Sequence, residues 1–350
     1  MKKIIMGVSG ILSLLIFLIL FGISNYMAEA LITQQMAKWW SDEEDVAQIS
    51  CFFSPNALVT EDMILGFEHS VENALKEASI IQDSANEKAR LWADAYSADG
   101  LVTIASDKAT IEADAIGIGG DFFLFHPLRL LSGSYFSGND VMQDYCVIDQ
   151  DAAWQLFGSN NVAGMTVYIG GVPHIVTGVV ERPEGRLEEA AGLDATVVYV
   201  SYDTLSALGR NNGINHYEIV MPNPVSQFAY NHVKDNIGVI KKDIEIVENT
   251  SRYSLLSRLQ TIKEFGTRSM NGKAIIYPYW ENIARGYEDI IALLTLLAIV
   301  FLAYPVLLYL VLFIIWWKRK GWTIKEQLLK QKDRFERACE KRRVGKTDGN

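Results

Sequence analysis

Two long runs of apolar residues lie at opposite ends of this chain. Between them, the apolar residues form shorter runs and periodic patterns. The first run, residues 4–23, has 20 residues without a charge, about the length that a helix needs to cross a bilayer. The second run, residues 290–317, has 28 and would span about 42 Å as a helix. Pro305 marks an expected kink. Trp316 and Trp317, followed by Lys318, fit an aromatic belt beside a basic flank. The pattern therefore predicts two transmembrane helices.

The first run has an alternative interpretation as a cleaved signal peptide. Ala28, Glu29 and Ala30 have the small-x-small pattern of a cleavage site. Signal peptides have an apolar region of about 7–15 residues, which is shorter than this run. The length therefore favours a membrane anchor.

Between the helices, one local pattern occurs twice. Residues 48–54 are rich in β-formers and end at Pro55-Asn56. A helix is then expected from Thr60, an N-cap type followed by two acidic residues. Its apolar face has a spacing of three or four residues, at Ile64, Phe67, Val71, Leu75 and Ala78.

The second copy follows much later. A strand at 216–221, a Pro222-Asn223 pair, a helical pattern through 225–233 and a strand at 243–247 repeat the first order. We interpret the copies as two related β-α-β halves separated by an insertion. Coincidence is the alternative, because Pro-Asn is a common loop pair.

The insertion is punctuated by glycines. Short strands are expected at 145–148, 166–169, 174–180 and 196–200, with one short helix at 151–157. The fold class is thus a membrane protein whose two transmembrane helices flank an α+β extracytoplasmic domain. That domain is a split β-α-β part with an inserted strand-rich subdomain. The expected organisation is N-terminus and helix 1–28, first β-α-β half 29–111, insertion 112–213, second half and stem 214–287, second helix 288–317 and basic tail 318–350.

Charge sets the orientation of the two helices. The tail from Lys318 holds 12 basic and 5 acidic residues, and Lys2 and Lys3 precede the first helix. The segment between these flanks holds 18 basic and 37 acidic residues. Since positive flanks stay in the cytoplasm, both termini are expected inside the cell membrane and the central domain outside. The acidic balance also argues against nucleic acid as a partner.

Catalytic patterns are missing from the sequence. Residues 266–273 (GTRSMNGK) look like a phosphate loop but have one residue too many, and Ala274 replaces the magnesium-binding hydroxyl. The five histidines, His69, His126, His174, His216 and His232, have no metal-site spacing. We expect packing or surface roles for them. No catalytic, cofactor-binding or metal-ligating residue is predicted, and the protein is not expected to be an enzyme.

Two of the three cysteines lie in the exported part. Cys51 and Cys146 both fall within β-rich runs, where a buried thiol is the usual outcome. A disulfide between them stays open, because their separation in space is not given by sequence.

Residues 119–180 contain the text GGDFFLFHPLRLLSGSYFSGND, followed by DYCVIDQDAAWQLFGSNNVAGMTVYIGGVPHIVTGVV. This text resembles the periplasmic core domain of MacB-type ABC transporter permeases. The family order of D-F-F, LFG, GM-T-V and a GG-x-P hairpin is present, and residues 196–202 (TVVYVSY) continue it. The resemblance covers roughly residues 1–317 and implies a membrane helix, this exported domain and a returning helix. It also implies that the split β-α-β part, 29–111 and 214–287, is a porter-like part interrupted by the inserted subdomain. Family members usually continue with two more membrane helices, which are not found in these 350 residues.

The resemblance implies a non-catalytic membrane subunit of an ABC-transporter-type complex. Its expected partners are a cytoplasmic ATP-binding subunit, a second permease chain or both, together with membrane lipid; a homo-oligomer is also compatible. The tail has a capping-box pattern at Thr323–Glu326 and an apolar stripe of Ile324, Leu328, Phe335 and Cys339. This stripe favours a helix on anionic lipid, with docking to an ATPase as the alternative.

The sequence leaves two other functions open. The first is a bitopic scaffold or regulator similar to the polysaccharide chain-length regulators. These rely on long helices, whereas the insertion here is strand-rich. The second is an extracytoplasmic sensor. The lack of a recognisable signalling domain after Lys320 counts against this function.

Overall fold

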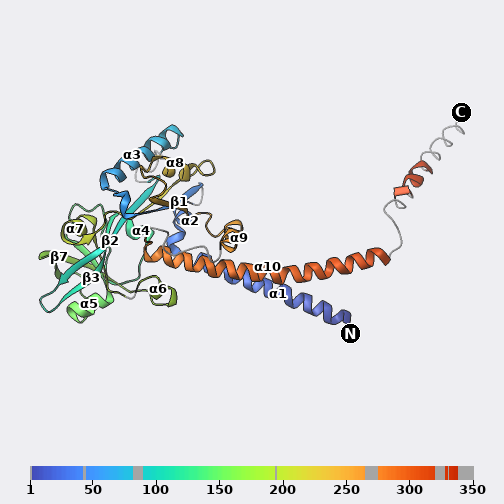
Figure 1. Cartoon of the computed structure of the whole chain (residues 1–350), viewed down its shortest axis with the longest axis horizontal. Coiled ribbons are helices and arrows are strands. Elements are labelled where there is room, and N and C mark those ends of the chain that lie inside the picture. Colours follow the sequence, from blue (N-terminus) through green and yellow to red (C-terminus); the bar gives the residue numbers. More distant parts are fainter. Residues whose placement is uncertain are drawn as a thin grey trace, which may run out of the picture. The chain divides into compact units, whose positions relative to one another are not determined.

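The computed structural model describes residues 2–41, 45–81, 90–193, 195–264, 275–319, 328–329 and 331–337. The chain divides into two compact units (Figure 1). One comprises Met1–Phe21 with Leu297–Asn350, and the other is Gly22–Leu296.

The first unit contains most of the two apolar helices, α1 (Lys2–Glu29) and α10 (Tyr279–Arg319). Both are long and apolar enough to cross a membrane. Small residues of α1 meet α10 within this unit: Ser13 Oγ donates to the Phe301 carbonyl at 2.6 Å, and the Ser9 and Tyr304 hydroxyls are 2.9 Å apart. Close approach at small polar residues is typical of helix pairing in lipid. The helix α10 runs through Pro305 as one element.

The second unit begins with the porter-like part. Its strands are β1 (Val46–Phe53), β2 (Ala93–Ala105), β10 (His216–Pro222) and β11 (Ile244–Glu248), and its helices are α3 (Glu61–Glu77) and α8 (Phe228–Asn236). The strand order is β11-β1-β10-β2, and each pairing is antiparallel. Two β-α-β units that exchange neighbours in this way form a ferredoxin-like split sheet.

The inserted part continues the same sheet. It comprises β3 (Thr110–Gly120), β4 (Leu130–Gly133), β5 (Tyr145–Asp149), β6 (Thr166–Ile169), β7 (Val172–Val180), β8 (Val197–Ser201) and β9 (Arg210–Asn211). The described strands form one 11-stranded sheet. The pairings β2-β3-β8-β5-β7-β6 return to β2 and so close a small barrel. Side chains such as Val167, Val198 and Leu205 fill its core.

Layers of helices cover the porter sheet. On one face α3 and α8 lie side by side (Figure 1), and Phe67, Val71 and Val233 pack onto Ile49 and Tyr217. Another cluster, which contains Phe122, Val220 and Trp280, forms the base of the domain. Burial of both faces explains why every residue of β1 and β10 is buried.

Shorter helical elements connect these layers. They are η1 (Ile32–Gln34), α2 (Met36–Trp40), η2 (Pro55–Ala57), α4 (Phe122–Phe125), α5 (Gln150–Phe157), α6 (Arg186–Ala190), α7 (Tyr202–Leu208) and α9 (Leu255–Lys263).

The structure confirms the expected fold class and most predicted elements. The two β-α-β copies correspond to β1-α3-β2 and β10-α8-β11, and the insertion contains the expected strands β5 to β8 and helix α5. The predicted residue limits of the domains stay predictions. The aromatic residues Tyr277 and Trp280, before the second apolar run, pack into the domain, where each is 3% exposed.

Candidate functional site

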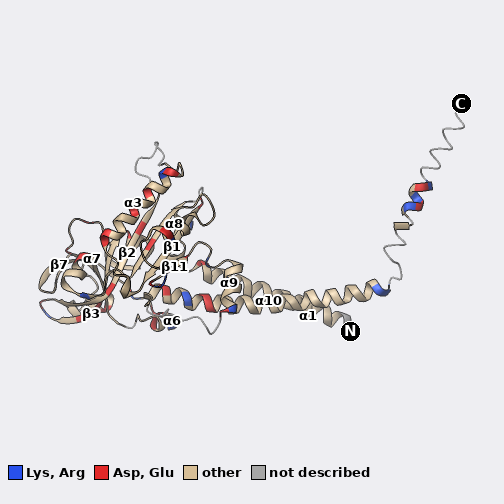
Figure 2. Ribbon diagram, turned by 45° about the horizontal axis from the view of Figure 1, so that its top comes forward, with Lys and Arg blue, Asp and Glu red and all other residues tan. Residues whose placement is uncertain are grey.

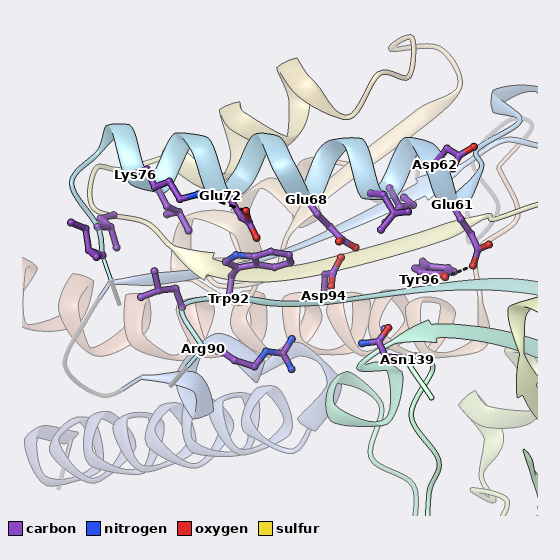
Figure 3. A pocket seen from close by; sticks show the side chains of 17 residues that line it. Glu61, Asp62, Glu68, Glu72, Lys76, Arg90, Trp92, Asp94, Tyr96 and Asn139 are labelled. Atoms are coloured by element: carbon purple, nitrogen blue, oxygen red, sulfur yellow. Dashed lines mark hydrogen bonds and ion pairs between the residues drawn. The ribbon is translucent and has the colours of Figure 1, made fainter. Parts of the chain in front are cut away.

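A pocket of about 900 Å³ opens between helix α3 and the start of strand β2 (Figure 3). The α3 wall carries carboxylates, including Glu61, Glu68 and Glu72, because these residues recur on one helix face. The opposite side carries Asp94 and Trp92. Apolar lining is supplied by Leu65, Ile80, Ile81 and Leu91.

The carboxyl groups of Glu68 and Asp94 face one another across the pocket (Figure 3). Asp94 is only 6% exposed, and its Oδ2 atom has no hydrogen-bond partner in the described chain. Burial and the neighbouring Glu68 raise the pKa of Asp94 well above its ordinary value. Burial likewise raises the pKa of Glu68. Two facing carboxyl groups of this kind hold a proton that isolated ones would release.

Other charged groups of the pocket are already engaged. Tyr96 donates a hydrogen bond to Glu61, and Arg90 Nη2 lies 2.5 Å from Asp121 Oδ2. The hydrogen bond to Asp121 raises the pKa of Arg90. The excess of carboxylates beside Trp92 therefore suits a ligand with a cationic group and an apolar body.

Replacing Asp94 by asparagine is expected to stabilise the protein at neutral pH by about 1–2 kcal/mol, because the neutral amide replaces a group whose ionised form is penalised by burial and by the neighbouring Glu68. A raised carboxyl pKa means that the folded state keeps a proton that the unfolded state loses above pH of about 4. Wild-type stability should therefore fall as pH rises from about 4 through the folded pKa of Asp94. Thermal unfolding of both proteins between pH 4 and 8 measures the difference.

The matched control is Asp62→Asn, at an exposed carboxylate of the same pocket. We expect its unfolding temperature to stay parallel to that of the wild type at every pH. A constant offset between the wild type and Asp94→Asn over the whole pH range would contradict the assignment of a shared proton.

A second polar site lies where α10 leaves the domain. The Arg252 side chain, 4% exposed, donates from Nη1 and Nη2 to the two oxygens of Glu281 at 2.7 and 2.8 Å. Its Nε donates to Glu288 Oε1 at 2.6 Å. Burial alone would lower the pKa of Arg252. The charges of Glu281 and Glu288 outweigh this effect and raise the pKa of Arg252 well above its ordinary value. The first turns of α10 are thus fixed to the loop between β11 and α9.

Arg285 extends this network to the sheet. Its Nε lies 2.7 Å from Glu281 Oε1 and its Nη2 lies 2.5 Å from Glu245 Oε1, on β11. The guanidinium also lies 3.9 Å from the ring centroid of Tyr277, which donates to Glu245. Basic and acidic residues mixed along the start of α10 are visible in Figure 2. Below, the junction denotes Glu245, Arg252, Glu281, Arg285 and Glu288.

The end of α1 is fastened beside the junction. Gln34 accepts a hydrogen bond from Arg252 Nη1 at 3.0 Å. From α9, Arg258 donates to Ser24 Oγ and to Asn25 Oδ1, both at 2.9 Å. Ser24 in turn lies 3.3 Å from the Thr295 hydroxyl of α10. The stems of both apolar helices therefore meet the segment that follows β11.

The structure places the cysteines, histidines and motifs considered in the sequence analysis in different environments. Cys51 and Cys146 are free and buried, and burial raises the pKa of the Cys146 thiol to about 12. His126 and His216 come together with Glu218. The GTRSMNGK segment, the capping box at Thr323–Glu326 and Cys339 lie outside the described residues. Leu328 and Phe335 are helical and exposed.

Sequence reasoning did not single out either polar site. In the sequence, only the apolar face of helix α3 and the two acidic residues of its first turn were noted. The junction pairs residues of α10 with Arg252 and Glu245, which lie 29 to 40 positions away along the chain. The i,i+4 spacing of Glu281 and Arg285 is its one local signal and does not reveal these partners.

Comparison with known families gives one match that covers most of the domain. The model of the MacB-like periplasmic core domain matches residues 5–232. Among curated proteins, the macrolide export ATP-binding/permease protein MacB of Pasteurella multocida is 36% identical over 98 residues, 27% of this chain and 14% of the relative. Its counterpart from Agrobacterium fabrum is 34% identical over 116 residues, 32% of this chain and 17% of the relative. The matched part thus spans less than a fifth of these relatives.

Two solved structures of transporter domains align with part of the chain. The periplasmic region of MacB from Actinobacillus actinomycetemcomitans aligns with a TM-score of 0.39 at 19% identity, covering 62% of this chain and 92% of that one. The extracellular domain of the ABC-type transporter YknZ from Gram-positive bacteria aligns with a TM-score of 0.35 at 18% identity, covering 57% and 99%.

Proposed function

Because the chain belongs to the MacB-like periplasmic core domain family, we propose that it is a non-catalytic, permease-like membrane subunit of an ABC-transporter-type complex. A separate cytoplasmic ATPase, with or without a second permease chain, supplies the energy. The extracytoplasmic domain handles the substrate or partner, with the pocket between α3 and β2 as its binding place.

The junction is the observation that carries this proposal. Helix α10 is one continuous element from Tyr279 to Arg319. Its first turns hold Glu281, Arg285 and Glu288 in buried or half-buried ion pairs with Arg252 and Glu245. Its later part is long and apolar enough to cross a membrane. A displacement of the membrane part would therefore be transmitted to β11 through paired charges that are costly to separate.

The proposal includes the orientation of the chain. Both termini lie in the cytoplasm, where Lys2, Lys3 and the basic tail face the ATPase and anionic lipid. The domain limits assigned from sequence, 29–111, 112–213 and 214–287, belong to the same proposal.

Affinity purification from the native membrane in mild detergent tests this function. We expect mass spectrometry to identify an ATP-binding subunit, a second permease chain or both with the full-length chain. A matched bait that lacks residues 318–350 should recover less ATPase if the tail contributes to docking. Recovery of self-assembled chain alone would contradict the transporter-subunit function and favour a bitopic scaffold.

A further inference from the structure

A buried group of three metal-binding side chains lies at the base of the porter sheet, apart from the pocket and the junction. His216 and Glu218 are two residues apart on β10 and therefore point to the same face of the strand. His126 follows α4 and reaches the same place. One ligand atom from each residue lies within 4.8 Å of the other two, and each residue is at most 1% exposed.

The contacts among these side chains do not satisfy their polar atoms. His126 Nε2 is 2.8 Å from Glu218 Oε2, and His216 Nε2 is 3.6 Å from Glu218 Oε1. The His126 and Glu218 atoms thus meet at ion-pair distance, whereas His126 Nδ1 and His216 Nε2 have no hydrogen-bond partner among the described residues. Unpartnered polar atoms at such depth are rare and costly. The three ligand atoms converge on one place, as the ligands of a common ion do.

From this geometry we propose that His126, His216 and Glu218 bind a divalent transition-metal ion of the zinc class. Ligands about 2.0–2.2 Å from a tetrahedral zinc ion lie roughly 3.3–3.5 Å from one another. The distances of 2.8 and 3.6 Å bracket this range, so small side-chain shifts suffice. Two imidazoles and one carboxylate form a donor set that suits zinc better than calcium or magnesium. Water supplies the remaining donor in sites of this kind.

Neighbouring groups orient the ligands as in known metal sites. The other ring nitrogen of His216, Nδ1, lies 3.3 Å from Ser97 Oγ, and Ser50 donates to Glu218 Oε1. Such outer partners fix the ring and carboxylate orientation.

The site also contacts the start of α10. The Trp280 ring centroid lies 4.2 Å from that of His126 and 5.0 Å from that of His216. An ion held here would fix β10 and the residue after α4 against the first turn of α10. The metal therefore acts as a structural clamp at the base of the domain. This assignment departs from the sequence-based expectation of no metal ligand.

The test uses the full-length chain in detergent with a purification tag free of histidine. After treatment with a chelator, Zn²⁺ is titrated by calorimetry, bound metal is counted by mass spectrometry and thermal unfolding is followed. We expect one Zn²⁺ per chain and, at a hundredfold excess over Kd, a rise in unfolding temperature of roughly 5–10 °C. Co²⁺ should give the visible absorption bands of a four- or five-coordinate site.

Variants identify the ligands. His126→Gln and Glu218→Gln should each weaken binding by at least about tenfold, whereas His69→Ala, which removes an exposed histidine on α3, should leave it unchanged. Binding that survives both ligand substitutions would overturn the proposal. So would a wild-type chain with neither a Zn²⁺-dependent thermal shift nor the Co²⁺ bands, and this readout needs no variant to fold.

Discussion

Arg252→Met is expected to lower the free energy of unfolding of the extracytoplasmic domain by about 3–5 kcal/mol. Arg252 is the guanidinium at the centre of the junction, with both of its edges used against Glu281 and Glu288. Glu281 is 1% exposed. Methionine fills a similar volume but leaves these carboxylates buried with less compensating charge. For a domain of this size the loss corresponds to a fall in unfolding temperature of roughly 10 °C.

Arg210→Met provides the matched control. Arg210 also pairs with a glutamate, Glu112, but their side chains are 73% and 56% exposed. Water solvates both ions there, so the loss should stay below about 1 kcal/mol. Equal losses at Arg210 and Arg252 would show that burial of the junction has no energetic consequence.

A double-mutant cycle separates the junction from general damage. Adding Glu281→Gln to Arg252→Met removes one of the uncompensated carboxylates and should recover part of the lost stability. Strict additivity of the two single changes would contradict a direct interaction between Arg252 and Glu281. Thermal unfolding of the full-length chain in detergent gives all four values.

Much of the fold could be predicted because it depends on local patterns. The apolar face of α3, with Ile64, Phe67, Val71 and Leu75 buried as expected, follows from helical periodicity. The repeated Pro-Asn pairs mark the ends of β1 and β10. The uncharged runs identified both apolar helices.

Other elements were missed for physical reasons. The long hairpin of β2 and β3, residues 93–120, was not predicted. Its strands contain Ala, Asp and Gly, which have low strand propensity, and tertiary packing decides their conformation. Gly119 lies against the Tyr96 ring, where an added Cβ would come within 2.4 Å of ring atoms.

The helix α10 begins at Tyr279, 11 residues before the apolar run, because its polar first turns face the protein.

The candidate sites could not be predicted from the sequence. Glu68 and Asp94 come from a helix and a strand, and only the fold brings their carboxyl groups face to face. His126 and His216 were assigned packing or surface roles, since 90 residues separate them. Two-residue spacing of His216 and Glu218 on one strand was the single available signal, and it is weak without its third member.

The second prediction concerns the coupling of the ATPase to the extracytoplasmic domain through α10. If α10 transmits the ATPase cycle to the domain, the junction must exist in at least two arrangements whose populations depend on the bound nucleotide. Backbone amides of β11 and α9 next to the junction should then exchange hydrogen at different rates in the two nucleotide states. A difference of about tenfold corresponds to about 1.4 kcal/mol in local opening energy.

Hydrogen exchange on the intact complex with its ATPase, with ADP and then with ATP and vanadate, tests this central claim most directly. We predict a change of about tenfold at residues 244–263 and 279–289, and none at the distant β6-β7 hairpin. Arg252→Lys keeps the charge but loses the two-pronged contact, so the change should shrink in this variant. Identical exchange at the junction in both nucleotide states would contradict the account.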